Sequence, residues 1–294
     1  MRLRDIHIRV GLFAVSLLAM LVGYHLLLMH HAPSVFNDAL EDMSYGWYVP
    51  VFSLYVLWTE RVKVLEAAGR DGAAGQGALG TALGLLMLLA SMFAGFLGAR
   101  GSQVRLEIVG FVGMLIGLAW TMFGTRTMKA TLFPALFLLF CLPLHTYLDL
   151  VTIHLRLLAV SIAQGALQGC GVEIVREGTM LVSPTGVFSI DVAEPCSGMR
   201  SLFAMMALTA AYSYFTQPTW FRRGLLFALS IPIAVLGNVS RILSIVAIAA
   251  TCSSDFATGF YHDYSGYVVF LVAVFLMVVT GGLITKGAER CARS

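Results

Sequence analysis

The chain has 294 residues, of which 59% are hydrophobic and only 12% are charged, and its formal net charge is +3. Soluble domains carry about 25% charged residues, so this composition excludes a soluble globular protein and indicates a polytopic membrane protein. Apolar runs close to the roughly 20 residues that cross a bilayer recur along the chain, with no long polar block among them. We therefore expect one integral, all-α membrane domain over residues 1–294.

Eight apolar segments are candidate membrane-spanning helices. In chain order they cover residues 10–29, 46–59, 77–98, 106–123, 131–148, 197–215, 224–250 and 264–284. The first follows a basic N-terminal stretch, as the core of a signal peptide would, but it has no small-residue cleavage site before His30-His31. We expect it to remain as the first helix.

A glycine-rich segment, AAGRDGAAGQGALG at 67–80, lies between the second and third candidate spans. It has no Gly-Lys-Ser or Gly-Lys-Thr ending and no preceding strand, so it does not match a phosphate-binding loop. We interpret it as a flexible loop.

The lysines and arginines orient these spans. With the N-terminus inside, the inner connections hold most of the 19 basic residues, whereas the outer connections hold only Arg100, Arg105, Arg156 and Arg176. Cytoplasmic loops retain positive charge, so both termini are expected in the cytoplasm, with the protein in the cell (inner) membrane. The net charge then reflects topology and gives no reason to expect nucleic acid as a partner.

Residues 151–195 depart from the pattern of spans. Polar side chains among the leucines and alanines of 151–169 favour a helix lying at the outer membrane interface. The Val-, Ile- and Thr-rich stretch after it, with a turn at Ser183-Pro184-Thr185-Gly186, predicts a β-hairpin. Because an open sheet edge cannot face hydrocarbon, the hairpin is expected to cap the outer side and lead into Cys196.

Cys196 lies in VAEPCSGMRSL, at the start of the sixth candidate span. Ser197 is a plausible N-cap there, and Gly198 would let a ligand approach the backbone closely. The unpaired amides and positive dipole of a helix N-terminus lower a thiol pKa and can stabilise an oxyanion. This position therefore favours a reactive thiolate, although Cys196 could also pack simply as a small apolar residue.

Two further residues fit the same chemistry. Asn238 and Arg241 are three apart in LGNVSRILSIV and share a helix face, and an arginine within a span normally faces the bundle interior for a functional reason or to pair with an acid. His262 lies at the outer mouth of the last span. The charge-derived topology places Cys196, Arg241 and His262 on the same outer side, where a nucleophile, a proton carrier and a cation would together support acyl transfer through a thioester.

Six stretches carry a resemblance to a known family. They are MSYGWYVPVFSLYVLW at 43–58, FPALFLLFCLPLH at 133–145, GVEIVREG at 171–178, DVAEPCSGMRSL at 191–202, GNVSRI at 237–242 and HDYSGY at 262–267. With these stretches in this order and a Glu-x-Cys-Ser-Gly core, the chain resembles the exosortase/archaeosortase family of membrane-embedded cysteine transpeptidases.

The resemblance implies that Cys196 is the nucleophile, Arg241 the essential arginine and His262 the third catalytic residue. It implies as partners exported proteins with a C-terminal sorting signal, which consists of a short motif (Pro-Glu-Pro in the bacterial type), one transmembrane helix and a basic tail. The acyl group would pass to a cell-surface or lipid acceptor. We add the hypothesis that Arg241 or Arg200 pairs with the glutamate of the motif.

The set of supporting or substrate-binding residues is then Glu194, Ser197, Gly198, Arg200 and Asn238. We expect no cofactor and no metal, since the histidines at 30, 31 and 145 have no Cys or acidic neighbours at ligand spacing. A disulfide between Cys170 and Cys252 at the oxidising outer face stays open.

Three other functions stay open. A transporter would use Arg241 in a substrate pathway but should show repeated halves, which the sequence lacks. An intramembrane cysteine protease would use the same three residues only to hydrolyse its thioester. A catalytically inactive scaffold would have no reason to keep all three.

Overall fold

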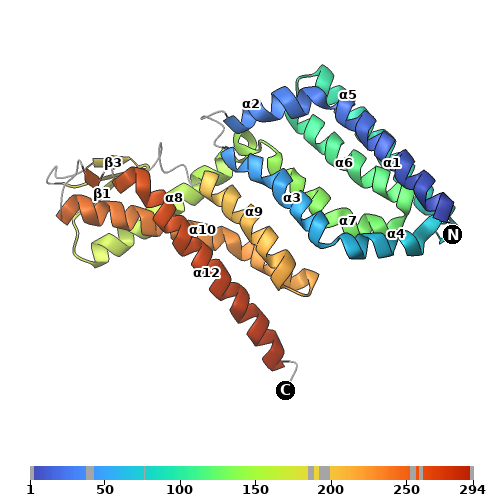
Figure 1. Cartoon of the computed structure of the whole chain (residues 1–294). Helices are drawn as coiled ribbons and strands as arrows, with labels where there is room; N and C mark the ends of the chain where they lie inside the picture. Colours follow the sequence, from blue (N-terminus) through green and yellow to red (C-terminus); the bar gives the residue numbers. More distant parts are fainter. Residues whose placement is uncertain are drawn as a thin grey trace. The chain divides into compact units, whose positions relative to one another are not determined.

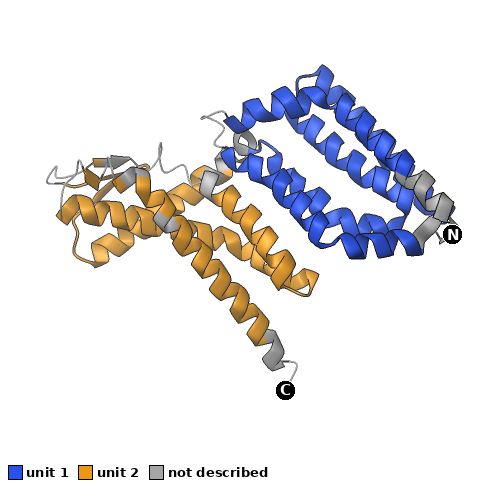
Figure 2. Cartoon of the chain, viewed as in Figure 1, with its two compact units in different colours: residues 1–144 blue, residues 145–294 orange. Residues whose placement is uncertain are grey.

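A computed structural model describes residues 3–37, 43–75, 77–184, 189–191, 199–251, 256–257 and 261–291. These residues are mostly helical, as the sequence predicts. The chain divides into two compact units, residues 1–144 and 145–294, shown in blue and orange in Figure 2.

Unit 1 is a helical bundle whose central pair is α5 and α6. Its elements are α1 (Leu3–Gly23), the π-helix η1 (Leu27–His31), α2 (Ala32–Asn37), the 3-10 helix η2 (Ser44–Trp47), α3 (Tyr48–Thr59), α4 (Arg61–Gly75), α5 (Ala78–Arg100), α6 (Val104–Phe123), α7 (Thr125–Phe137) and the 3-10 helix η3 (Leu138–Cys141) (Figure 1). Helix α6 contacts α1, α4, α5 and α7, so it forms the centre of this unit.

Glycines let α5 and α6 approach closely. A Cβ atom added at Gly110 would come within 2.6 Å of the Gly95 nitrogen, and one at Gly117 within 2.8 Å of the Leu88 nitrogen. Lipid supplies no hydrophobic force between helices, so close backbone packing of small residues is the main attraction available. The glycines of this pair therefore hold the bundle together.

Replacing Gly110 with alanine is expected to destabilise unit 1 by about 1–3 kcal/mol, because the new methyl group would overlap backbone atoms that cannot turn away. Gly11→Ala in α1 is the matched control, since nothing lies within 4 Å of its Cβ position. Unfolding in detergent by stepwise addition of SDS measures both. Equal stability of the two variants would contradict this account of the α5–α6 contact.

A partly buried hydrogen-bonded pair of a histidine and a glutamate joins η1 to α6. His31 Nδ1 lies 2.9 and 3.1 Å from the two carboxylate oxygens of Glu107. Glu107 is only 2% exposed, and it stands in the first turn of α6, where the helix dipole favours a negative charge. The sequence analysis gave His31 no acidic partner. The acid comes from 76 residues further along the chain.

Three sequence predictions in and beside unit 1 are wrong in detail. The first span is bent by 57° between Gly11–Gly23 and Leu27–Asn37. The supposed flexible loop at 67–80 is mostly helix, because α4 continues to Gly75 on alanine-rich sequence and packs on α7. The span at 131–148 is broken after η3, since Pro143 cannot donate to a helix and disfavours helical geometry in the residue before it.

Unit 2 is a second helical bundle with a small sheet. Its elements are α8 (His145–Gly169), β1 (Val175–Glu177), β2 (Met180–Val182), β3 (Ser189–Asp191), α9 (Met199–Thr216), α10 (Trp220–Thr251) and α12 (His262–Cys291). Helix α10 contacts α8, α9 and α12. The predicted interfacial helix is the larger part of α8, which buries one face: Ala159, Val160 and Ala163 pack in one core with Ile242 and Val246 of α10.

The sheet is a three-stranded antiparallel meander in the order β1-β2-β3, rather than a single hairpin. The first turn lies at Gly178-Thr179, where Gly178 has φ +65°, a conformation that suits glycine. Leu181 of β2 is fully buried in the α8–α10 core, and the Arg176 guanidinium contacts the Ser161 hydroxyl of α8. The sheet is thus fixed to α8. The predicted turn at 183–186 extends into residues outside the described part of the chain.

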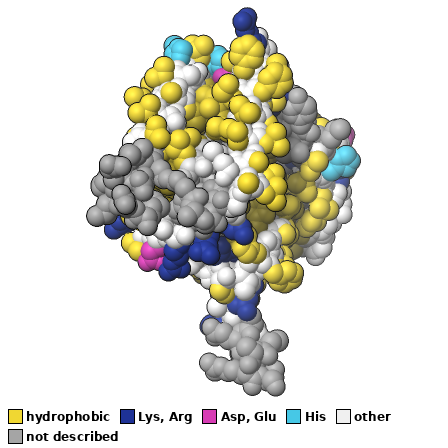
Figure 3. Space-filling view, turned by 90° about the vertical axis from the view of Figure 1, so that its right-hand side faces the viewer, with side chains coloured by type: hydrophobic (Ala, Val, Ile, Leu, Met, Phe, Trp, Pro, Cys, Tyr) yellow, Lys and Arg dark blue, Asp and Glu magenta, His cyan; other side chains and the backbone are white. Residues whose placement is uncertain are grey.

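The described residues contain four helices that are long and apolar enough to cross a membrane: Ala78–Arg100, Val104–Phe123, Trp220–Thr251 and Tyr264–Gly287. The bent pair in residues 11–37 would make a fifth, and Leu202–Thr216 is a shorter apolar helix. Hydrophobic side chains cover much of the face in Figure 3, and Phe93 and Phe275, for example, are 64% and 65% exposed. These features fit a multi-pass membrane protein, while the count of eight spans is not confirmed.

Candidate functional site

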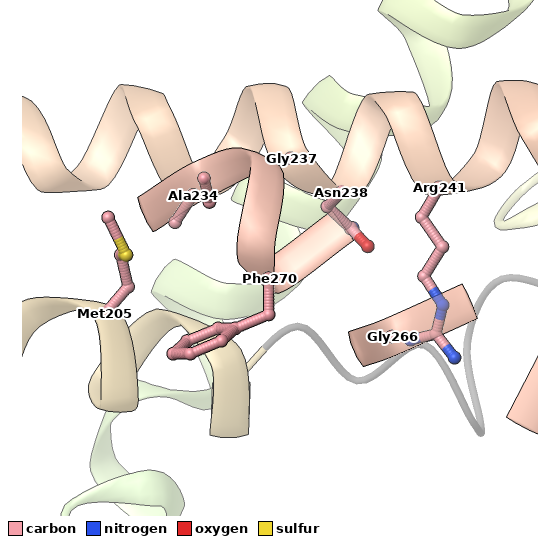
Figure 4. Close-up of a pocket in the computed structure, with 8 residues that line it drawn as sticks. Met205, Ala234, Gly237, Asn238, Arg241, Gly266 and Phe270 are labelled. Carbon is pink, nitrogen blue, oxygen red and sulfur yellow. The ribbon is translucent and has the colours of Figure 1, made fainter. Parts of the chain in front are cut away.

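A small cavity of about 40 Å³ lies among α9, α10 and α12 of unit 2. Its lining residues are Met205, Ala234, Gly237, Asn238, Arg241, Gly266, Phe270 and Ala273 (Figure 4). Arg241 and Asn238 make one end polar, and the others are small or apolar. A volume of this size accommodates a few water-sized groups but no complete amino-acid residue.

Helix α10 supplies the polar end because its side chains repeat with the helical period. Residues 234, 237, 238 and 241 follow the i, i+3, i+4, i+7 spacing and therefore share one face. Ala234 and Gly237 are small and leave the space, whereas Asn238 and Arg241 place polar groups beside it. Arg241 is ten residues before the last residue of α10, which corresponds to about 15 Å of helix.

Arg241 reaches across to the first turn of α12. Its Nε donates a hydrogen bond to the Ser265 hydroxyl at 2.9 Å, and Ser265 is completely buried. A Cβ atom at Gly266 would lie 3.8–3.9 Å from the guanidinium Cζ and both Nη atoms. The guanidinium therefore lies close to α12 at Gly266, as Figure 4 shows.

The electrostatics of this point favour an anion. A guanidinium stays positively charged at any pH relevant to a protein, and the N-terminus of α12 adds the positive end of a helix dipole. Both lie in the apolar surroundings of a membrane protein, where fixed charges act more strongly than in water. Such a site can stabilise a thiolate or an oxyanion.

Apolar side chains pack at the other end of the cavity. Met205 of α9, Ile233 of α10, and Ala273 and Met277 of α12 form one buried cluster. The cavity therefore has an apolar end at Met205 and Ala273 and a polar end at Arg241 and Asn238.

The structure brings together Asn238 and Arg241 of the predicted site residues. His262 is the first residue of α12 and Arg200 the second residue of α9, and for these two only the helical backbone is described. Cys196, Glu194, Ser197 and Gly198 lie outside the described residues, within the segment between β3 and α9.

Sequence reasoning missed Ser265 and Gly266. The signal for both is the HDYSGY stretch, in which a small polar residue follows His262 by three positions and so lies on the same helix face. That Arg241 is the hydrogen-bond partner of Ser265 follows only from the contact between α10 and α12 in the structure.

The sequence expectations on metal and disulfide chemistry concern residues of which the structure describes only a part. Within it, no three His, Cys, Asp or Glu side chains lie together in a way that could hold a metal ion. Cys170 is a free, exposed cysteine. Its considered partner, Cys252, lies outside the described residues.

The fold fits a multi-pass helical membrane protein, in which a small cavity lined by Arg241 and Asn238 lies among three helices. The sequence model of the transmembrane exosortase family matches residues 38–279, so the chain belongs to that family. No curated protein and no solved structure matches the chain at a significant level.

Proposed function

We propose that this exosortase-family protein is a cysteine transpeptidase, with Cys196, Arg241 and His262 as its catalytic residues. The observation that carries the proposal is the seat of Arg241: its guanidinium lies against the first turn of α12, the helix that begins with His262. Helix α9, which begins three residues after Cys196, contacts both α10 and α12. Arg241 and His262 thus belong to two helices that contact each other, and the helix that follows Cys196 in the sequence contacts both.

The proposed reaction has two steps. The Cys196 thiolate attacks the scissile carbonyl carbon, the oxyanion forms near Arg241, and His262 gives a proton to the leaving amine as the peptide bond breaks. An acceptor hydroxyl or amine then attacks the thioester, loses its proton to His262 and releases the Cys196 thiolate. Arg241 thus compensates negative charge on the oxyanion in both steps.

The proposed substrates are exported proteins with the C-terminal signal of motif, transmembrane helix and basic tail. The motif's glutamate would pair with Arg241 or Arg200, with Asn238 adding an amide at the same cavity. Glu194, Ser197 and Gly198 would support Cys196. Reversing the charge of the motif's glutamate is expected to abolish processing under this pairing.

The proposed topology places both termini in the cytoplasm and the site at the outer side of the inner membrane, with about eight spans in all. Arg222, Arg223 and Lys286 then lie inside, as cytoplasmic positive charge requires. A substrate helix could lie against the bundle in the bilayer, with its motif outside and its basic tail inside.

Co-expression with a tagged substrate tests the proposal. The substrate ends in Pro-Glu-Pro, a transmembrane helix and a basic tail, and tail removal is followed by immunoblot. We expect processing with the wild-type protein and with Cys170→Ala, the matched cysteine control, and none with Cys196→Ala. The mass of the new C-terminus distinguishes transfer from hydrolysis.

Two results would overturn the proposal. Equal processing by wild type and Cys196→Ala would show that another protein removes the tail. If the only product had a free carboxylate at its new C-terminus, even with hydroxyl and amine acceptors present, the protein would be a protease and not a transpeptidase. A transporter pathway has weaker support, because the cavity at Arg241 is only about 40 Å³ and ends in packed apolar side chains.

A further inference from the structure

Ser265 is a buried polar residue that the catalytic scheme above does not use. It is fully buried in the first turn of α12, in an environment where a hydroxyl costs free energy unless it is hydrogen-bonded. Its hydroxyl accepts the hydrogen bond from Arg241 Nε at 2.9 Å. The buried hydroxyl of Ser265 is therefore hydrogen-bonded to a specific side chain, that of Arg241.

The hydrogen bond at Nε restricts how the guanidinium is turned. The guanidinium is planar, and its donors form a rigid fork. A contact at Nε therefore fixes the direction of one donor and restricts the directions available to both Nη groups. Gly266 lies beside the guanidinium, since a Cβ atom built there would be 3.8–3.9 Å from Cζ and both Nη atoms, which is ordinary van der Waals distance.

Ser265 also connects the helices that carry Arg241 and His262, two of the three proposed catalytic residues. It lies three positions after His262, hence on the same face and one turn along α12. Arg241 extends from α10, one of whose faces lines the cavity. The link between Arg241 and Ser265 therefore sets the guanidinium relative to the turn that begins with His262.

We propose that Ser265 is a positioning residue for Arg241, which holds the guanidinium in the orientation that stabilises the oxyanion. The proposal rests on the proposed function. It assigns Ser265 no contact with the substrate, and its effect passes through Arg241 alone.

Steady-state kinetics of the purified full-length protein, with a synthetic substrate carrying the motif and helix, test this assignment. Ser265→Ala removes the acceptor, and Ser265→Cys keeps nearly the same volume with a weak acceptor. We expect both to lower kcat by about tenfold to hundredfold, as loss of a hydrogen bond to a charged group implies. KM should change much less, because oxyanion stabilisation acts in the transition state.

Ser244→Ala is the matched control. The Ser244 hydroxyl donates to the Arg241 main-chain carbonyl, so its loss leaves the guanidinium seated and kcat close to that of wild type. A second comparison uses an Arg241→Lys background, whose side chain has no Nε to bind Ser265. There Ser265→Ala should have little further effect on kcat.

Several outcomes would overturn the assignment. The first is an unchanged kcat in Ser265→Ala. The second is a wild-type kcat in Ser265→Cys together with a low kcat in Ser265→Ala. The third is that Ser265→Ala lowers kcat by the same factor in the wild-type and Arg241→Lys backgrounds. The second would mean that volume matters and the hydrogen bond does not, and the third that Ser265 acts on the fold. Failure of the proposed transpeptidase function would look different, because the substrate would then still be processed by the Cys196→Ala variant. In that case the positioning role of Ser265 would be rejected as well.

Discussion

Replacing Arg241 with alanine is expected to lower the rate of substrate processing by about a hundredfold to a thousandfold. The guanidinium lines the cavity among α9, α10 and α12, where it is partly buried, and partial burial weakens the screening of its charge by water. An oxyanion formed there would lose its main compensating charge. The rate of tail removal with purified protein and synthetic substrate measures the loss.

Arg241→Lys is expected to recover little of this rate, although it keeps the positive charge. An ammonium group has no planar fork and no Nε, so it cannot use the Ser265 hydroxyl at the position where the guanidinium does. The geometry of the site would therefore be lost while its charge remained. A fully active lysine variant would show that charge alone is sufficient and would contradict a geometric role for the guanidinium.

Arg223→Ala is the control for loss of an arginine from the same unit. Arg223 Nε donates to the Gln217 main-chain carbonyl at 2.8 Å, and its guanidinium stacks over Tyr214 at 4.7 Å. These contacts stabilise the turn between α9 and α10 and are separate from the cavity lining. We expect some loss of thermal stability in this variant and a rate per folded molecule near that of wild type.

The sequence predicts most of the apolar helices well. The segments 77–98, 106–123 and 224–250 correspond to Ala78–Arg100, Val104–Phe123 and Trp220–Thr251. Length and apolarity decide such helices, because a backbone in lipid must satisfy its hydrogen bonds internally. No information from elsewhere in the chain is needed for them.

Features that depend on local backbone chemistry were harder to predict. The break before α8 was missed because the apolar run continues through Pro143, although proline was the available warning. The predicted turn at 183–186 falls between β2 and β3, whereas the turn at Gly178 between β1 and β2 is an additional one that the sequence analysis does not predict. The turns at Gly178 and at 183–186 lie in one β-rich stretch, and only the pairing of the strands shows that both are used.

Contacts between distant segments account for the rest. Spacing along one helix predicts that Asn238 and Arg241 share a face, and they do line one cavity. The bond from Arg241 to Ser265 joins residues on two helices, so periodicity cannot reveal it. The same holds for His31 and Glu107, although an acid inside an apolar segment was itself a sign of an unseen partner.

Replacing His31 with alanine is expected to destabilise unit 1 by about 1–3 kcal/mol, because it leaves the buried Glu107 carboxyl group without its hydrogen-bond partner. The two side chains are 31% and 3% exposed, so the acid cannot turn to water. Lys63→Ala is the comparison, since the Lys63–Glu60 pair is short, at 2.6 Å, but its lysine is largely exposed. Loss of such a surface pair should cost about 1 kcal/mol or less. Unfolding in detergent with increasing SDS measures both variants.

The double replacement His31→Leu with Glu107→Leu distinguishes two free energies. One is the cost of leaving a buried carboxyl group without its partner, and the other is the net contribution of the intact pair to stability. Removing both partners also removes the desolvation penalty, so the double variant should be more stable than His31→Ala and close to wild type. Glu107→Gln should lie between them, because its amide oxygen still accepts from Nδ1 without a charge. If the double variant were as unstable as the two single losses added together, the two side chains would contribute independently. The buried pair would then not be what links η1 to α6, and the bend after α1 would need another support.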